Sequence, residues 1–136
     1  MNKKVYVDTD IVLDLLTERK PFYNSAAKIF SLAVENKIQL FVSPVLISNV
    51  FYILRKSSGQ ESAVINLRKL RTMINIVPVN QKIIDHVLAS NFKDLEDGIQ
   101  YYSAIEAGIK IILTRNSKDF TGKPVSIMNC EEYLAV

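Results

Sequence analysis

The sequence predicts an α/β fold, in which one domain over residues 1–136 has a mainly parallel central sheet between two layers of helices. Short segments rich in β-branched and aromatic residues alternate along the chain with longer segments whose apolar residues recur at helical spacing. Such alternation is typical of parallel sheets whose strands are joined by right-handed helical crossovers. The continuously apolar centre of residues 110–114 is typical of a strand that helices cover on both faces.

Five strands are expected, because five short segments combine extended-structure propensity with turn or cap residues at their ends. The first contains Val5, Tyr6 and Val7, and the spacing of apolar residues becomes helical from Ile11 onward. The predicted strands are residues 5–7, 38–42, 74–79, 110–114 and 125–128. We expect the fourth to be central in the sheet.

The helices between these strands are marked by residues that begin or end helices. Pro21 ends the first helix and lies near the start of the second, and Ser43 provides an N-cap that is followed by a first-turn proline. Asp97 is expected to open the helix that Gly108 ends as a C-cap. The predicted helices are residues 11–16, 22–36, 44–56, 60–73, 81–90, 97–107 and 131–134.

The composition predicts a compact, soluble, cytoplasmic protein. Hydrophobic residues make up 49% of the chain and charged residues 23%, which argues against a disordered or fibrous protein. The longest apolar runs are far too short to span a bilayer, and the N-terminus leads into a strand rather than into a signal-peptide core. Cys130 is the only cysteine, so we expect a buried thiol and neither an internal disulfide nor a zinc site.

The net charge of +3 permits a polyanionic partner without requiring one. Basic residues cluster at residues 55–56 and 68–71, whereas Asp94, Glu96 and Asp97 form an acidic block. A basic rim beside acids suits a metal-dependent enzyme that acts on a phosphodiester chain, because the cations hold phosphates and the acids hold the metal. Solvated helix faces explain the same charges, and charge patterning alone favours that simpler interpretation.

Acidic and amide side chains stand where predicted strands end. Asp8 ends the first strand, and Asn116 follows the fourth. The carboxyl ends of parallel strands line the crevice in which ligands bind, and a helix opened by Asp97 can reach the same edge. Asp8 and Asp10 together are typical of a site for a hard divalent cation. An alternative interpretation needs no metal: Asp10 only caps the next helix, and Asp8 starts a turn.

Three segments carry a resemblance to a known family: residues 5–16 (VYVDTDIVLDLL), residues 94–108 (beginning DLED) and residues 113–120 (LTRNSKDF). In this order they resemble PIN-domain proteins, metal-dependent ribonucleases that include the VapC-type toxins of bacterial toxin–antitoxin pairs. The resemblance covers nearly the whole chain. It implies a PIN-like version of the three-layer fold.

The resemblance also implies a catalytic site of four positions. Asp8 matches the first position and Asp97 the third, while Asn116 stands at the fourth, with Asp119 three residues further on. At the second position Asn49 replaces the Glu of the family. An amide oxygen can bind a divalent cation but adds no charge, so metal affinity should be lower.

Three acids are candidates to supply the charge that Asn49 lacks, and the sequence does not choose between them. They are Asp94 and Glu96 of the acidic block, and Asp10. The resemblance implies Asp8, Asp97 and Asn116 as catalytic residues. The expected metal ligands are Asp8, Asp97, Asn49 and Asp94.

The activity that the resemblance implies is hydrolysis of RNA by water activated on Mg²⁺ or Mn²⁺. Thr9 is expected to donate its hydroxyl to a scissile phosphate or to a carboxylate, and Arg115 to hold a phosphate or to serve the structure. Such a site needs no histidine, so His86, the only one, is expected at a helix surface or core edge. Family analogy further implies a homodimer and a small antitoxin protein as a partner.

Two other functions compete with an RNA-cleaving enzyme. A strand followed by Asp-x-Asp also resembles the start of haloacid-dehalogenase-type phosphatases, in which Asp8 would be the phosphorylated nucleophile and Asp10 the general acid. Lys110 and the acidic block fit the rest of that pattern poorly. The second alternative is a metal-free PIN-like binding or assembly module, because Asn49 and Asn116 lower the negative charge of the site.

Overall fold

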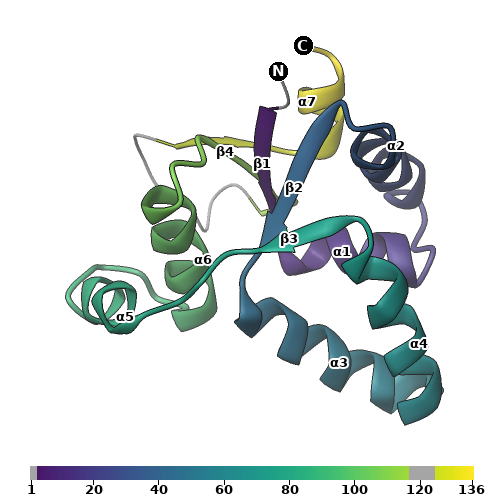
Figure 1. Cartoon of the computed structure of the whole chain (residues 1–136), viewed down its shortest axis with the longest axis horizontal. Helices are drawn as coiled ribbons and strands as arrows, with labels where there is room; N and C mark the ends of the chain where they lie inside the picture. The colour runs from purple at the N-terminus through teal and green to yellow at the C-terminus, as the bar shows by residue number, and fades with distance from the viewer. Residues whose placement is uncertain (1–2, 117–124) are drawn as a thin grey trace.

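A five-stranded sheet forms the centre of the computed structural model, which describes residues 3–116 and 125–136 (Figure 1). The strands are β1 (Lys3–Val7), β2 (Ile38–Val42), β3 (Ile74–Ile76), β4 (Ile111–Leu113) and β5 (Ser126–Met128). Their order across the sheet is β3-β2-β1-β4-β5, and each neighbouring pair is parallel. The predicted α/β fold with a mainly parallel sheet is confirmed.

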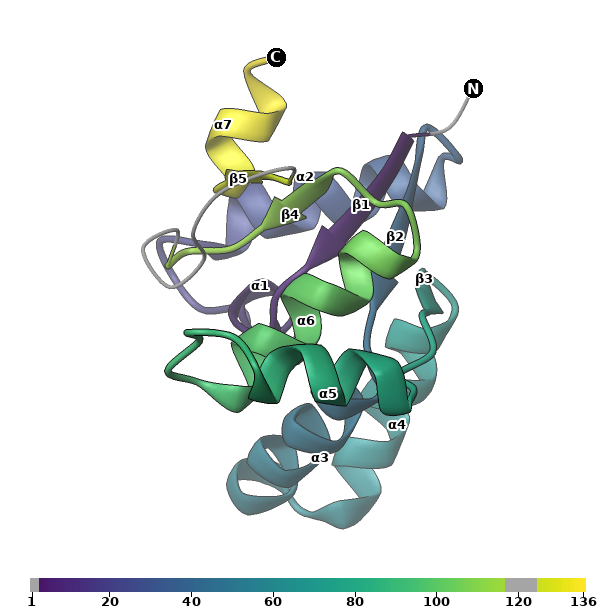
Figure 2. The same ribbon diagram turned by 90° about the vertical axis from the view of Figure 1, so that its left-hand side faces the viewer.

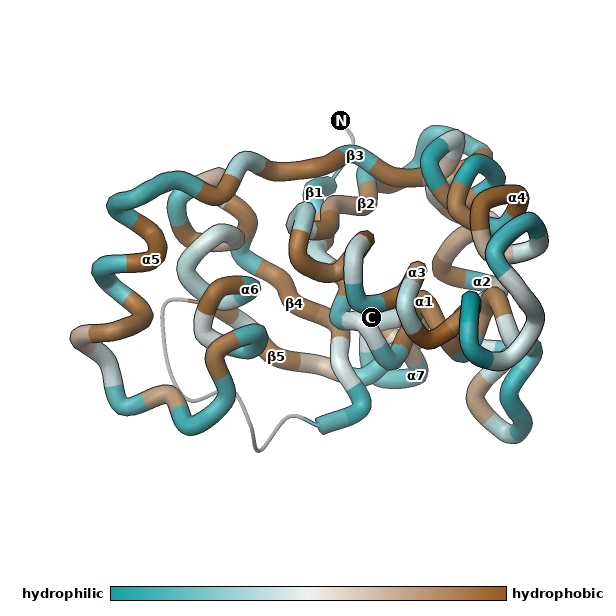
Figure 3. Tube along the Cα trace, turned by 90° about the horizontal axis from the view of Figure 1, so that it is seen from below, coloured by the Kyte–Doolittle hydropathy of each residue, from teal (hydrophilic) through white to brown (hydrophobic). Residues whose placement is uncertain are grey.

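Helices cover both faces of this sheet. In the described part of the chain they are α1 (Thr9–Leu16), α2 (Tyr23–Val34), α3 (Pro44–Ser58), α4 (Gln60–Arg71), α5 (Gln81–Leu88), α6 (Leu95–Glu106) and α7 (Cys130–Leu134). α5 and α6 lie on one face and the other helices on the opposite face, as Figures 1 and 3 show from two directions. Figure 2 shows α5 and α6 in front of the strands. Among these described helices, none combines the length and apolar character needed to cross a lipid bilayer.

The side chains of β1 alternate between the two faces, as the two-residue period of a strand requires. Val5 and Val7 are buried in the core that β1 and β2 share with α1, α2, α3 and α4. Tyr6 is buried on the opposite face, in a cluster with Tyr101 of α6. β1 is also paired with a strand on each side. The carboxyl end of β1 is thus held by a strand on each side and by packed side chains on both faces.

Two predicted strand features differ from the structure. β3 ends at Ile76, three residues earlier than expected, although the Val77 N–H still donates to the Val42 carbonyl (2.9 Å). Pro78 follows, and a proline has no N–H with which to continue the pairing. β4 lies between β1 and β5, so the prediction that the fourth strand is central was wrong, and β1 holds that place.

The start of α6 also differs from the prediction. Asp94 is the N-cap, and its Oδ1 accepts a hydrogen bond from the Asp97 N–H (3.0 Å). An N-cap side chain satisfies one of the free N–H groups in the first turn, so the helix begins at Leu95. Asp97 therefore does not open α6. Glu96 and Asp97 both lie in its first turn.

Candidate active site at the carboxyl end of the sheet

Asp8 lies buried at the carboxyl end of β1, directly before α1. Its backbone N–H donates to a carbonyl oxygen of β4 (2.9 Å), so the residue is still held by the sheet. Oδ1 of Asp8 accepts hydrogen bonds from the Thr9 N–H and from Gln100 Nε2, both at 2.7 Å. Oδ2 accepts one from Thr114 Oγ1, also at 2.7 Å. Asp8, rather than Asp10, is the N-cap of α1.

The two side chains that orient Asp8 were not expected from the sequence. Gln100 of α6 and Thr114 after β4 are both buried. A carboxylate only accepts hydrogen bonds, so the Gln100 nitrogen must face it, and Oε1 of Gln100 is left without a partner among the described residues. One signal could have found Gln100: it is a polar residue on a helix face that is otherwise apolar, and buried polar groups need partners.

Glu96 is the second carboxylate of the site. Its Oε2 accepts a hydrogen bond from Thr9 Oγ1 (2.5 Å), and its Oε1 accepts one from Asn49 Nδ2 (2.6 Å). Thr9 therefore bridges two carboxylates, because its N–H bonds Asp8 while its hydroxyl bonds Glu96. Of the two partners expected for the Thr9 hydroxyl, the structure has the carboxylate. Asn49 of α3 presents its amide nitrogen, a donor, to Glu96.

Two partly buried carboxylates, Asp8 and Glu96, concentrate negative charge at the site. Burial raises the pKa of the Asp8 carboxyl, and its hydrogen bonds offset this only in part. Burial likewise raises the pKa of Glu96, and the charge of Asp8 raises it further. Within residues 3–116 and 125–136, neither carboxylate forms an ion pair with a lysine or arginine. A bound cation would stabilise both charged forms.

Asp97 is half-buried in the same turn of α6. It follows Glu96 and precedes Gln100 by three residues, a spacing that places two side chains on neighbouring positions of a helix face. The end of α6 that carries Asp97 is therefore the end whose side chains reach Asp8 and Thr9. The structure brings these segments to one edge of the sheet. Asp94, by contrast, is exposed and caps the helix.

Asn116 lies on the outer side of the site. Its Nδ2 donates to Asp10 Oδ2 (3.1 Å), and its N–H donates to Thr114 Oγ1 (3.1 Å). Thr114 thereby links Asn116 to Asp8, since the same hydroxyl donates to the carboxylate. Asp119, which the sequence also placed here, lies outside the described residues.

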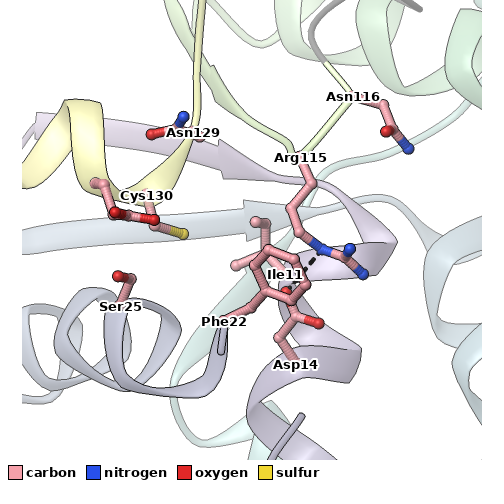
Figure 4. Close-up of a pocket in the computed structure, with 9 residues that line it drawn as sticks. Ile11, Asp14, Phe22, Ser25, Arg115, Asn116, Asn129 and Cys130 are labelled. Atoms are coloured by element: carbon pink, nitrogen blue, oxygen red, sulfur yellow. Dashed lines mark ion pairs between the residues drawn. The ribbon is translucent and has the colours of Figure 1, made fainter. Parts of the chain in front are cut away.

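Arg115 lines a separate cavity of about 200 Å³, with Asn116 at its rim (Figure 4). Its Nε lies 3.0 Å from Oδ2 of Asp14, a residue that is 1% exposed, and its guanidinium carbon lies 4.1 Å from the centroid of the Phe22 ring. Burial raises the pKa of Asp14, and the charge of Arg115 lowers it in part. Arg115 thus has a structural partner, while its contact with phosphate stays a prediction.

The donors at the site fit a hard cation, although they do not form a preassembled cage. Within the described ranges, no three acidic, histidine or cysteine side chains group closely enough to hold a metal by themselves. Mg²⁺ is usually bound through one or two carboxylates, with water and substrate phosphates completing its octahedron. Among the described residues, Oδ2 of Asp8 and both oxygens of Glu96 accept one hydrogen bond each, so each keeps a lone pair for a ligand.

Comparison with known proteins identifies the family. A family model described as the PIN domain matches residues 4–118. The chain belongs to the PIN-domain family. The resemblance noted in the sequence is confirmed, and this membership leaves no basis for the haloacid-dehalogenase-type alternative. Ribonuclease VapC1 of Aquifex aeolicus (strain VF5) is 28% identical to this PIN domain over 137 residues, which cover 97% of this chain and 94% of that protein.

Solved structures of toxin–antitoxin proteins share the fold of this PIN domain. DNA-bound VapBC from Salmonella typhimurium aligns with a TM-score of 0.74 at 16% identity, covering 96% of this chain and 99% of that one. A toxin–antitoxin complex from Klebsiella pneumoniae aligns at 0.70 and 23% identity, covering 93% and 97%. VapC20 of Mycobacterium tuberculosis, a toxin that cleaves the sarcin-ricin loop, aligns at 0.68 and 14% identity, covering 85% and 92%.

Proposed function

We propose that this PIN domain is an endoribonuclease that hydrolyses RNA phosphodiester bonds with the help of Mg²⁺ or Mn²⁺, and that it is the toxin of a toxin–antitoxin pair. The observation that carries the proposal is the pair of carboxylates, Asp8 and Glu96, which Thr9 holds together and which form no ion pair with a lysine or arginine of the described residues. The similarity to a protein named Ribonuclease VapC1 supports RNA as the substrate class.

The proposed metal-binding and catalytic acids are Asp8 and Asp97, with Asn116 as the further catalytic member. A bound divalent cation would lower the pKa of the attacking water and offset the charge that develops on the phosphate. The three hydrogen bonds to Asp8 fix its carboxylate in one orientation, so little reorganisation is needed when a ligand binds. Asn116 is held beside the site by Asp10 and can present its amide oxygen to a water or phosphate.

Cleavage of labelled RNA by the purified protein tests this proposal. We expect cleavage with Mg²⁺ or Mn²⁺, and none when EDTA removes the metal. Asp8→Asn and Asp97→Asn should each slow cleavage at least about 100-fold, the loss typical when one preorganised electrostatic group is removed from an active site. Circular dichroism should show both variants folded. Cleavage at the wild-type rate in both variants would refute the assignment.

A matched control uses the same chemical change away from the site. Asp85 lies exposed on α5, so Asp85→Asn should cleave RNA like the wild type. The metal-free module is the alternative function, because Asn49 and Asn116 reduce the negative charge of the site. Calorimetry that detects no Mn²⁺ binding at millimolar metal would favour that module over the enzyme.

The proposed protein partner is a small antitoxin, since two similar folds come from toxin–antitoxin complexes. A short neighbouring reading frame with a DNA-binding pattern, whose product co-purifies with this chain and suppresses RNA cleavage, would support this part of the proposal. The homodimer and the cytoplasmic location remain predictions. Light scattering of the isolated protein tests the first of these.

A further inference from the structure

Asn49 leaves the second position of the site without a carboxylate, and the structure places another carboxylate against that same side chain. Asn49 Nδ2 on α3 donates to Glu96 Oε1 on α6 over 2.6 Å. We propose that Glu96 supplies the missing carboxylate and binds the divalent cation together with Asp8, while Asn49 acts as a positioning residue. This inference rests on the proposed function, because it concerns the same metal site.

The other two acids that could supply the charge are engaged elsewhere. Asp94 is exposed, and its Oδ1 caps the backbone of α6. Asp10 is held on the exposed side of the site by Asn116 Nδ2. Glu96 is half-buried, and its Oε2 accepts a hydrogen bond from Thr9, the residue next to Asp8, while its Oε1 accepts one from Asn49. Of the three candidates, Glu96 is the one that the surrounding structure directs toward the proposed metal.

Thr9 sets the separation of the two carboxylates. Its N–H and its hydroxyl belong to one residue, and they bind Asp8 Oδ1 at 2.7 Å and Glu96 Oε2 at 2.5 Å. Two partly buried carboxylates held this close repel each other, which is costly unless a cation lies between them. Each has an oxygen with a lone pair left over. The arrangement is the one expected of a pair that shares a cation.

The amide at position 49 is the chemical partner that this arrangement needs. A glutamate at position 49 would place a second carboxylate against Glu96. Two carboxylates at this distance repel each other, so both could not be ionised at once. An amide nitrogen donates to Glu96 and adds no charge. Asn49 and Glu96 therefore form a matched pair of one amide and one acid. Exchanging the two side-chain types would keep both the hydrogen bond and the total charge.

Binding of Mn²⁺ without RNA, measured by calorimetry on the full chain, tests the inference. We expect Glu96→Gln to weaken Mn²⁺ binding at least about tenfold, the lower end of the loss seen even for residues that only support a ligand. The exchange variant, which combines Asn49→Glu with Glu96→Gln, should recover most of the lost affinity. Asp85→Asn is the control and should bind like the wild type. Circular dichroism and thermal melting verify that each variant folds.

The outcomes separate this inference from the proposed function. If Asp8→Asn abolishes Mn²⁺ binding while Glu96→Gln leaves it unchanged, the metal site stands and the role of Glu96 is overturned. A folded exchange variant that binds no better than Glu96→Gln would also overturn it, because a purely structural hydrogen bond would then explain the pair. A wild-type protein that binds no Mn²⁺ overturns the metal-dependent function itself.

Discussion

Replacing Arg115 with methionine would leave the Asp14 carboxylate buried with one weak partner. Asp14 is 1% exposed, and its nearest cationic group among the described residues is Arg115 Nε at 3.0 Å. Arg19 is farther, at 3.8 Å, and its side chain is 43% exposed. Breaking a buried ion pair from one side typically costs about 3–5 kcal/mol, because the remaining charge is uncompensated. Since Arg19 remains, we expect Arg115→Met to lower the free energy of unfolding by about 2–4 kcal/mol near neutral pH.

The pH dependence of this loss follows from the direction of the pKa shift. Burial raises the pKa of Asp14 above its ordinary value, and removal of Arg115 should raise it further. A carboxyl with a higher pKa in the folded state binds its proton more tightly when folded. Its contribution to stability is therefore fully present below the unfolded pKa and is lost as pH rises through the folded pKa. The deficit of Arg115→Met should be largest near neutral pH and should shrink toward about pH 4.

Urea unfolding of the wild type and the variant, at neutral and at acidic pH, measures this deficit. Lys82→Met is the control, because it breaks a pair with Glu106 at a similar distance (3.5 Å) whose side chains are 62% and 46% exposed. Exposed pairs contribute about 0–1 kcal/mol. An Arg115→Met deficit no larger than that of Lys82→Met, or one that stays constant with pH, would refute the reasoning about the buried Asp14 charge.

Two further predictions concern buried side chains near the site. Thr114→Val removes the donor to Asp8 Oδ2, so Mn²⁺ affinity and the rate of RNA cleavage should fall about 10–100-fold, as is typical when the support of a metal ligand is lost. A Mn²⁺ affinity that calorimetry finds unchanged would contradict this. Cys130 is buried, which raises the pKa of its thiol to about 12, so iodoacetamide at mildly alkaline pH should label this thiol only after denaturation. Mass spectrometry measures the labelling, and rapid labelling of the native protein would contradict the buried placement.

The layers of the fold could be predicted from sequence because they depend on local periodicity. The alternation of Val5, Tyr6 and Val7 already separates the two faces that the structure covers with different helices. The order of the strands is a different matter. It depends on which distant segments pair, and nothing in the apolar run of β4 distinguishes an interior strand beside β1 from the middle of the sheet. A continuous apolar run indicates that helices cover a strand on both faces. Two or more strands of one sheet can meet that condition, so the run does not give the position of the strand in the sheet.

The candidate site was predictable where it follows strand ends and was not where it depends on helix rotation. Asp8 and Asn116 fall at the edge that the alternation predicts. Glu96 and Gln100 depend on where α6 begins, because each residue of shift turns a helix by about 100°. Taking Asp97 as the first residue of the helix left Glu96 outside it. The Asp94 cap brings Glu96 into the first turn, one helical turn before Gln100, and both then reach the strand end.

The position of Asp8 explains how the fold can keep a buried carboxylate in readiness for a ligand. Burying this charge costs free energy, as its raised pKa indicates, and the hydrogen bonds to the carboxylate offset part of that cost. β1 has a paired strand on each side and buried side chains on both faces, so its end has little freedom to move. The two side-chain donors to the carboxylate come from the segment after β4 and from α6, which are packed in the same core. The rigid middle of the sheet therefore keeps the Asp8 carboxylate away from the water that would otherwise solvate it. A bound divalent cation would offset the free energy that burial of this charge costs.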